Sequence, residues 1–306
     1  MAVPDSDPLA AWLADRLGLP LAGRTPVGGG CIHGAWCLTL ADGSRRFAKT
    51  SPAAALPLLE AEAEGLRALA AAADPAQLVV PGPLALGRVE GQAVLVLPWL
   101  NLGGDGWRAF GASLAALHRR SLQGPLVEGD RGAAAFGWPR DNALGTSPQP
   151  NGWLEDWGGF FVQRRLAPQL TRLSRAVGEL PGAAELLAAV PDWLASHRPE
   201  PCLVHGDLWS GNGAPLVEGR AALFDPAVHR ADREVDLAMA RLFGGFPEAF
   251  FEGYGAEWPL PEAHGGRVAL YNLYHLINHA NLFGGSYINQ VRLAIVRLLR
   301  EPPGQP

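Results

Sequence analysis

The strongest constraint on this chain is a set of oxygen-bearing side chains between residues 204 and 226. Asp207 and Asn212 lie five positions apart in the stretch V-H-G-D-L-W-S-G-N, and Asp225 follows beyond a turn at Glu218-Gly219. Carboxylate and amide oxygens are the ligands that Mg²⁺ prefers in proteins. The chain is therefore expected to fold so that a strand, a loop and a hairpin bring these three side chains together.

The spacing His-x-Asp-x4-Asn matches the catalytic loop of protein kinases. In that arrangement Asp207 accepts a proton from a hydroxyl group, and Asn212 and Asp225 bind magnesium. Asp and Asn are also ordinary turn residues, but three of them at this spacing favour phosphoryl transfer. The sequence contains no G-x-S-x-G and no G-x4-G-K-[ST], so a serine hydrolase is disfavoured and a P-loop NTPase is excluded.

The first hundred residues offer candidates for binding a nucleotide. Gly28, Gly29 and Gly30 form a turn where the backbone can approach phosphates closely, although a plain hairpin explains the glycines equally well. Lys49 is the only lysine in the sequence and lies on the strand after the Asp42-Gly43 turn, where kinases place their phosphate-binding lysine.

Two further features complete this nucleotide site. Glu60, Glu62 and Glu64 lie on the next expected helix and could orient the lysine, although at least one of them must face solvent. A strand ends at Pro98, where a nucleotide base would accept from the N–H of Leu100 and donate to the carbonyl of Pro98.

The hydrophobic pattern predicts an α+β protein of two lobes, and the catalytic-loop spacing indicates that this is the two-lobed protein-kinase-like fold. A β-rich N-terminal lobe, residues 1–97, carries a helix at 56–73, and a larger helical C-terminal lobe spans 98–306. The other predicted helices cover 5–18, 106–120, 151–176, 183–197, 234–252, 266–282 and 289–300. Residues 123–150 are predicted to form a loop.

Composition narrows the class of protein. Hydrophobic residues make up 48% and charged residues 18%, which indicates a packed globular chain. The net charge of -5 and the absence of a Lys/Arg run argue against a nucleic-acid partner. The sequence has no uncharged apolar run of 18 residues, so no membrane-spanning helix is expected. The acidic N-terminus lacks the pattern of a signal peptide, and three cysteines are consistent with a reducing compartment. We therefore expect a cytoplasmic protein.

Several stretches resemble one family. They are LVHGDLWSGN, LFDPA, DREVDLAMARLFGGFP, GGGCI at 28–32, the E-x-E ending at Glu62, and FG…N-x-W-x-x-DW-x-x-FF at 136–161. Together they cover most of the chain and resemble the fructosamine kinases (ketosamine-3-kinases), which are related to aminoglycoside and choline phosphotransferases.

The resemblance implies roles for individual residues. Asp207 would be the catalytic base, Asn212 and Asp225 the magnesium ligands, and Lys49 with Glu62 the ATP-phosphate site.

It also implies supporting and substrate-binding residues. Asp236 would hold the catalytic loop, and Trp209, Trp153 and Asp156 would line the substrate pocket. Cys31 matches a position linked to redox-sensitive dimerisation, although an unmodified thiol is the simpler expectation.

Four histidines lie in the expected catalytic and substrate-binding regions. His205 could be an acid–base group, but support of the catalytic loop is the better interpretation. His275 and His279 are expected to pack or to contact substrate. The family's aromatic residue after D-P-A-x is replaced here by His229-Arg230.

The function that follows is an ATP- and Mg²⁺-dependent kinase that phosphorylates the 3-hydroxyl of small or protein-bound ketoamines, which releases the amine and repairs glycation. The alternatives are a phosphotransferase for an aminoglycoside or choline, and a catalytically silent nucleotide-binding module. The second is disfavoured because Lys49, Asp207, Asn212 and Asp225 are all present. The absence of carboxylates from residues 271–290 disfavours an aminoglycoside. A monomer and a homodimer are both compatible with the sequence.

Overall fold

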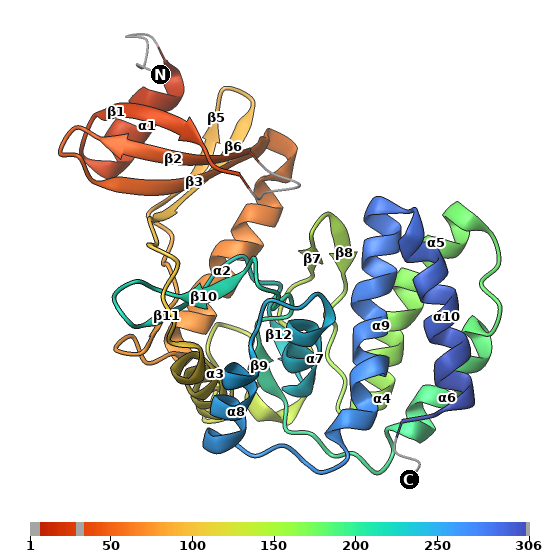
Figure 1. The fold of residues 1–306 in the computed structure, drawn as a ribbon. Helices are drawn as coiled ribbons and strands as arrows, with labels where there is room; N and C mark the ends of the chain where they lie inside the picture. The colour runs from red at the N-terminus through yellow and green to blue at the C-terminus, as the bar shows by residue number, and fades with distance from the viewer. Residues whose placement is uncertain (1–6, 29–33, 304–306) are drawn as a thin grey trace.

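The computed structural model describes residues 7–28 and 34–303, with a sheet at one end and helices at the other (Figure 1). The sheet has five antiparallel strands in the order β1-β2-β3-β6-β5. They are β1 (Leu21–Pro26), β2 (Gly34–Leu40), β3 (Arg45–Pro52), β6 (Gln92–Pro98) and β5 (Ala85–Val89).

Two helices cover opposite faces of this sheet. Side chains alternate between the faces along β6, because successive residues of a strand point to opposite sides. Val94 and Val96 pack in one cluster with Leu13 of α1 (Pro8–Leu17). On the other face, Ala93, Leu95 and Leu97 pack with Leu59 of α2 (Leu56–Ala72). Strand β6 is therefore apolar on both faces from Ala93 to Leu97.

Helix α2 extends beyond the sheet into the helical part of the molecule, as Figure 1 shows. Leu69 and Ala72 pack in one cluster with Phe110 and Leu114 of α3 (Trp107–Ser121). The Glu64 carboxylate accepts a hydrogen bond from Trp138 Nε1 at 2.9 Å and pairs with Arg140 at 3.4 Å. A second link between the sheet end and the helical part is the short strand β4 (Leu78–Val79), which pairs in parallel with β11 (Ala221–Leu223).

The helical part contains two apolar clusters, one around α3 and α8 and one around α9. Its helices are α4 (Trp157–Phe160), α5 (Ala167–Val177), α6 (Ala183–Trp193), α7 (Glu234–Leu242), α8 (Glu248–Glu257), α9 (His264–Phe283) and α10 (Ser286–Arg300). The short strands are β7 (Asn142–Leu144), β8 (Ser147–Gln149), β9 (Cys202–Val204), β10 (Gly213–Pro215) and β12 (His229–Ala231). Within the described ranges no helix is both long and apolar enough to cross a membrane.

The architecture confirms the α+β class and the two-part arrangement, but three local predictions were wrong. The helix predicted from residue 151 begins at Trp157, because Asp156 caps it, and it passes through a π-helical turn at Phe161–Leu166. The predicted loop at 123–150 contains the β7–β8 hairpin. The predicted division between residues 97 and 98 stays a prediction.

The single helix predicted for 234–252 is two helices. Gly244 and Gly245 between α7 and α8 have φ angles of 73° and 92°, in the left-handed region that favours glycine. A Cβ atom on Gly245 would overlap the side chain of Ser210. The two glycines therefore end α7 and let the turn approach the loop that contains Asp207.

Candidate active site

The loop after β9 is fixed by hydrogen bonds to one buried carboxylate. Asp236, on α7, accepts the backbone N–H of His205 at 2.7 Å and that of Gly206 at 2.8 Å. Gly206 has a φ of 80°, and a Cβ atom there would overlap the carbonyl of Ala227. Position 206 is therefore restricted to glycine, and Asp236 sets the path of the chain just before Asp207.

The His205 ring joins this loop to the segment that carries Asp225. Its Nδ1 accepts the N–H of Asp207 at 3.3 Å, and its Nε2 lies 3.0 Å from the carbonyl of Phe224. This pattern requires a proton on Nε2 and none on Nδ1, which is the neutral tautomer. Burial also lowers the pKa of His205. The ring is thus a connector between the two loops.

Asn212 brings Asp207 and Asp225 together. Its Nδ2 donates to the carbonyl of Asp207 at 2.9 Å, to Oδ2 of Asp207 at 3.1 Å and to the carbonyl of Asp225 at 3.4 Å. These contacts use the amide nitrogen, so the amide oxygen is the atom of Asn212 that can bind a cation. Asp225 has a φ of 58°, which is unusual for a residue with a side chain. Such strained backbone positions cluster at functional sites.

Lys49 connects the sheet to this group. Its Nζ lies 2.8 Å from Oε1 of Glu62 on α2 and 2.7 Å from Oδ1 of Asp225. Burial opposes the charge on Lys49, but the two carboxylates outweigh burial and raise its pKa. The lysine stays protonated and is available to an anionic ligand.

The charges around Asp207 suit a divalent cation. Burial and the nearby charge of Asp225 raise the pKa of Asp207 to about 8. Three carboxyl groups (Glu62, Asp207 and Asp225) thus share one lysine, and Asp207 keeps its proton near pH 7 until a further cation offsets the charge of Asp225. The oxygens of Asn212 and Asp225, beside more carboxyl groups than one lysine can neutralise, fit Mg²⁺.

The remaining predicted nucleotide residues lie at the edges of this site. Pro98 ends β6 opposite Arg46 of β3, and Leu100 is partly buried in the segment that follows. Gly28 lies in a turn two residues after the end of β1. Gly29, Gly30 and Cys31 lie outside the described residues.

The predicted substrate residues are divided between two places. The Trp209 ring lies over Gly211, where a Cβ atom would overlap it, so this indole is held beside the catalytic loop. Trp153 packs against Gly137, and Asp156 caps α4 by accepting the N–H of Gly159 at 2.6 Å. A substrate contact by Trp153 or Asp156 stays a prediction.

Arg230 does not line a pocket but holds neighbouring segments together. Its guanidinium is fully buried and forms two hydrogen bonds with Asp130, from Nε at 2.6 Å and from Nη2 at 2.7 Å. It also donates to the carbonyls of Ser121, Gly124 and Pro201. Arg230 therefore clamps β12, and through it β9, onto the end of α3.

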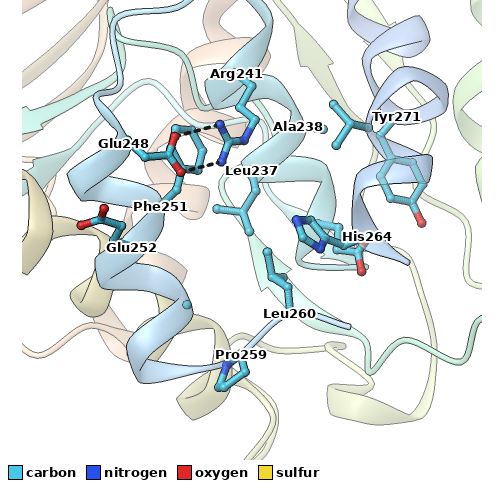
Figure 2. Close-up of a pocket in the computed structure, with 13 residues that line it drawn as sticks. Leu237, Ala238, Arg241, Glu248, Phe251, Glu252, Pro259, Leu260, His264 and Tyr271 are labelled. Carbon is cyan, nitrogen blue, oxygen red and sulfur yellow. Dashed lines mark hydrogen bonds and ion pairs between the residues drawn. The ribbon is translucent and has the colours of Figure 1, made fainter. Parts of the chain in front are cut away.

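A groove of about 310 Å³ lies between α7, α8 and the start of α9 (Figure 2). Its wall is largely apolar, and Glu248 at its rim pairs with Arg241 at 3.3 Å. Among the described residues that line it, none is Lys49, Asp207, Asn212 or Asp225. The groove alone therefore does not mark the site of chemistry.

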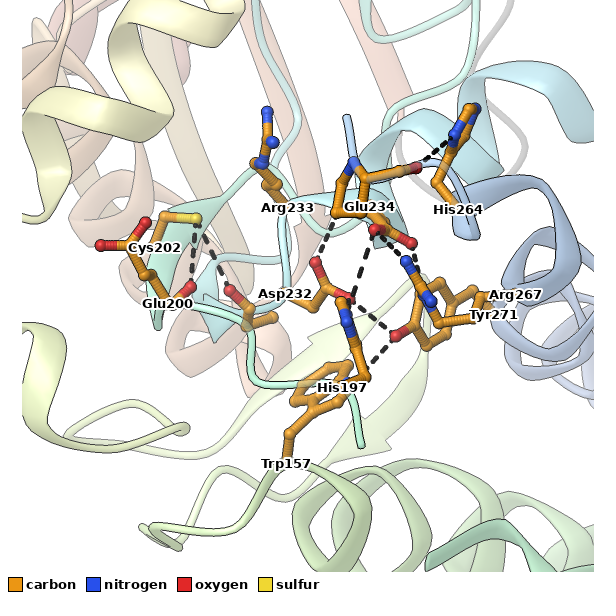
Figure 3. A network of polar contacts seen from close by, with 12 residues as sticks. Trp157, His197, Glu200, Cys202, Asp232, Arg233, Glu234, His264, Arg267 and Tyr271 are labelled. Carbon is orange, nitrogen blue, oxygen red and sulfur yellow. Dashed lines mark hydrogen bonds and ion pairs between the residues drawn. The ribbon is translucent and has the colours of Figure 1, made fainter. Parts of the chain in front are cut away.

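A second polar cluster joins α7 to α9 (Figure 3). His197 Nε2 lies 2.7 Å from Asp232, and Tyr271 donates to the same carboxylate at 2.7 Å. Arg267 forms two hydrogen bonds with Glu234, at 2.6 and 2.8 Å. His197, Asp232 and Glu234 are close enough to hold a metal ion, but each carboxylate already has a donor or a cation. The cluster is a structural clamp.

Comparisons with known proteins agree with this geometry. The family model for fructosamine kinase matches residues 8–301. This chain belongs to the fructosamine kinase family.

Three similar proteins illustrate the membership. A "probable ketoamine kinase" of Synechocystis sp. is 42% identical over 95% of this chain and 96% of its own length. A chloroplastic protein-ribulosamine 3-kinase of Oryza sativa is 32% identical over 98% of this chain and 86% of its own. A crystal structure assigned as a fructosamine-3-kinase of Haemophilus somnus superimposes with a TM-score of 0.83 at 27% identity, covering 95% of this chain and 96% of that one.

The fold is shared more widely. Choline kinase of Streptococcus pneumoniae superimposes with a TM-score of 0.61 at 13% identity, covering 95% of this chain and 98% of that one. At this identity the likeness shows the fold alone. It confirms the protein-kinase-like architecture that the catalytic-loop spacing predicted.

Sequence reasoning missed one part of this fructosamine kinase site. His118 on α3 lies between Asp236, at 3.2 Å from Nε2, and the Tyr254 hydroxyl, at 2.9 Å from Nδ1. All three side chains are buried. His118 and Tyr254 are 136 positions apart, and neither lies in a recognisable motif. Only their shared contact with Asp236 reveals the role.

Proposed function

We propose that this member of the fructosamine kinase family is an ATP-dependent ketoamine 3-kinase that requires Mg²⁺. The observation that carries the proposal is the convergence of three segments on one site: β3 brings Lys49, the loop after β9 brings Asp207 and Asn212, and the segment after β11 brings Asp225. Phosphoryl transfer needs mainly positioning and charge neutralisation, and these residues provide both.

The chemistry assigns one role to each residue. Asp207 accepts the proton of the acceptor hydroxyl and orients its oxygen toward the γ-phosphorus of ATP. The new bond joins that oxygen to phosphorus, the bond to the bridging oxygen breaks, and ADP leaves. Lys49 binds the phosphates and is held in place by Glu62. Asn212 and Asp225 would hold Mg²⁺, which would neutralise the charge of the phosphates.

The substrate class follows from the family and from the chemistry of the acceptor side. The relatives named above are ketoamine and ribulosamine kinases. Trp209 offers a flat apolar wall to a sugar and a cation–π face to its amine. Phosphorylation of the 3-hydroxyl would destabilise the adduct and release the amine, which makes deglycation the proposed role. A cytoplasmic location and the choice between monomer and homodimer stay predictions.

Two matched variants test the division of labour. Asp207→Asn should abolish turnover and leave Mg·ATP binding nearly intact, because Asp207 acts on the acceptor. Asp225→Asn should weaken nucleotide binding only when Mg²⁺ is present. Calorimetric titration with ATP, with and without Mg²⁺, separates the two effects. Equal loss of ATP affinity in both variants would contradict the assignment.

The substrate is tested with a panel in a coupled ADP-release assay. Fructose-lysine and a ribulosamine should be turned over, whereas kanamycin and choline should give little product, and phosphorus NMR should place the phosphate on the 3-hydroxyl. Comparable turnover of choline or kanamycin with none on ketoamines would refute the substrate class and leave the kinase activity standing.

A further inference from the structure

Four aromatic side chains from three neighbouring segments meet at the end of α7. His279 of α9 lies at the centre, with ring-centroid distances of 4.6 Å to Phe243, 5.5 Å to Phe283 and 5.2 Å to Tyr287. Phe243 follows α7, Phe283 ends α9, and Tyr287 lies in the first turn of α10. We call these four residues the aromatic ledge.

The ledge remains open to solvent. Phe283 is 52% exposed and Phe243 39% exposed, although each ring has aromatic neighbours. The arginine–ring contacts in the described part of the chain involve other rings, so no guanidinium covers these faces. Exposed aromatic rings that gather from three elements are typical of a binding surface rather than of a core.

The turn after α7 links the ledge to the catalytic loop. Phe243 lies two residues before Gly245, and Gly245 contacts the side chain of Ser210. Ser210 in turn follows Trp209 and lies three residues after Asp207. The turn between α9 and α10 lies on the side of the helical part toward the N-terminal sheet, as Figure 1 shows. An acceptor whose hydroxyl meets Asp207 can therefore extend past Trp209 onto the ledge.

The chemistry of the ledge selects the part of the acceptor that it binds. Residues 271–290 contain no Asp or Glu, and burial lowers the pKa of His279, so its ring is neutral near pH 7. An uncharged aromatic surface favours an apolar or aromatic group and also accepts a cation on a ring face. It does not supply the carboxylates that several ammonium groups would require.

We propose that the aromatic ledge binds the amine substituent of the ketoamine, the group on the nitrogen that points away from the sugar. The inference rests on the proposed ketoamine kinase function and adds a specificity site to it. The sugar would lie beside Asp207 and Trp209, and the alkyl or aryl substituent would cover Phe243 and Phe283. The enzyme then prefers ketoamines of large apolar amines to those of small ones.

The test compares two acceptors with the same sugar, the fructosamines of benzylamine and of methylamine. In wild type, the KM for the benzylamine adduct should be lower than that for the methylamine adduct by on the order of tenfold. Burial of the benzyl ring against the rings of the ledge is expected to strengthen binding by about this factor. Phe283→Ser and Phe243→Ser should each remove most of this KM ratio, and Phe283→Leu should retain part of it. Leu293→Ser is the matched control, because Leu293 is 70% exposed on α10 and lies outside the ledge.

The outcomes separate this inference from the function beneath it. A KM ratio that survives in both serine variants, or a wild-type ratio near one with good turnover of both adducts, overturns the ledge and leaves the ketoamine kinase standing. Loss of the ratio in Leu293→Ser also overturns it, because the effect would then not belong to the ledge. Failure of wild type to phosphorylate either adduct overturns both proposals.

Discussion

The Asp130–Arg230 pair allows a stability prediction with a defined size. Both side chains are fully buried, and Arg230 donates two hydrogen bonds to the carboxylate and three to backbone carbonyls. Removing one partner of such a pair leaves a buried charge without its counter-ion, which costs about 3–5 kcal/mol. Asp130→Ala should therefore lower the free energy of unfolding by that amount, a large share of the roughly 5–15 kcal/mol typical of a folded protein.

Urea denaturation at pH 7 measures the loss, with Glu155→Ala as the matched control. Glu155 also pairs with an arginine, Arg131 at 3.7 Å, but the two side chains are 80% and 45% exposed. An exposed pair contributes roughly 0–1 kcal/mol. The double variant Asp130→Leu/Arg230→Met should be more stable than either single variant, because it removes the unpaired charge. If Asp130→Ala costs no more than Glu155→Ala, the buried pair does not hold β12 as described.

Two further predictions concern the supports of the catalytic loop. Asp236→Asn should lower kcat by on the order of a hundredfold and leave the circular dichroism spectrum unchanged. The amide has only one oxygen to accept from the N–H groups of His205 and Gly206, so the catalytic loop would shift. An unchanged kcat would contradict this role of Asp236. Burial and the neighbouring His279 lower the pKa of His275 to about 3, below the 6.5 of an unfolded histidine, so the stability it contributes is present above pH 6.5 and is lost as the pH falls toward 3. Wild type should lose about 1.2 kcal/mol more than His275→Gln between pH 6 and pH 5 in urea titrations, and equal losses would show that His275 does not titrate differently on folding.

The sequence predicted the elements whose signals are local. The strand periodicity around Lys49 and the glycine at the end of α1 are both read from adjacent residues, and the structure agrees with them. The catalytic-loop spacing predicted that Asp207, Asn212 and Asp225 would lie together, and the hydrogen bonds of Asn212 join them.

What sequence reasoning missed depends on tertiary contacts. The break after α7 follows from the close approach of Gly245 to Ser210, which a helical hydrophobic pattern does not reveal. The Arg230–Asp130 pair spans 100 positions, and the resemblance to the family indicated only that an aromatic residue is replaced at this place. Trp153 and Trp157 are four positions apart, which is helical spacing, so the sequence predicted that the helix already included Trp153. Asp156 could be recognised as the helix cap only once the structure showed that the helix begins at Trp157.

The length of α2 has a consequence for how this enzyme is controlled. In protein kinases, the lysine–glutamate pair is opened and closed by moving the helix that carries the glutamate. Here the corresponding helix, α2, carries Glu62 near its middle and buries Leu69 and Ala72, at its C-terminal end, in the core around α3. Withdrawing it would also break the contacts of Glu64 with Trp138 and Arg140. We therefore expect an enzyme without an on–off switch at this helix, whose rate follows the concentrations of ATP and of the acceptor.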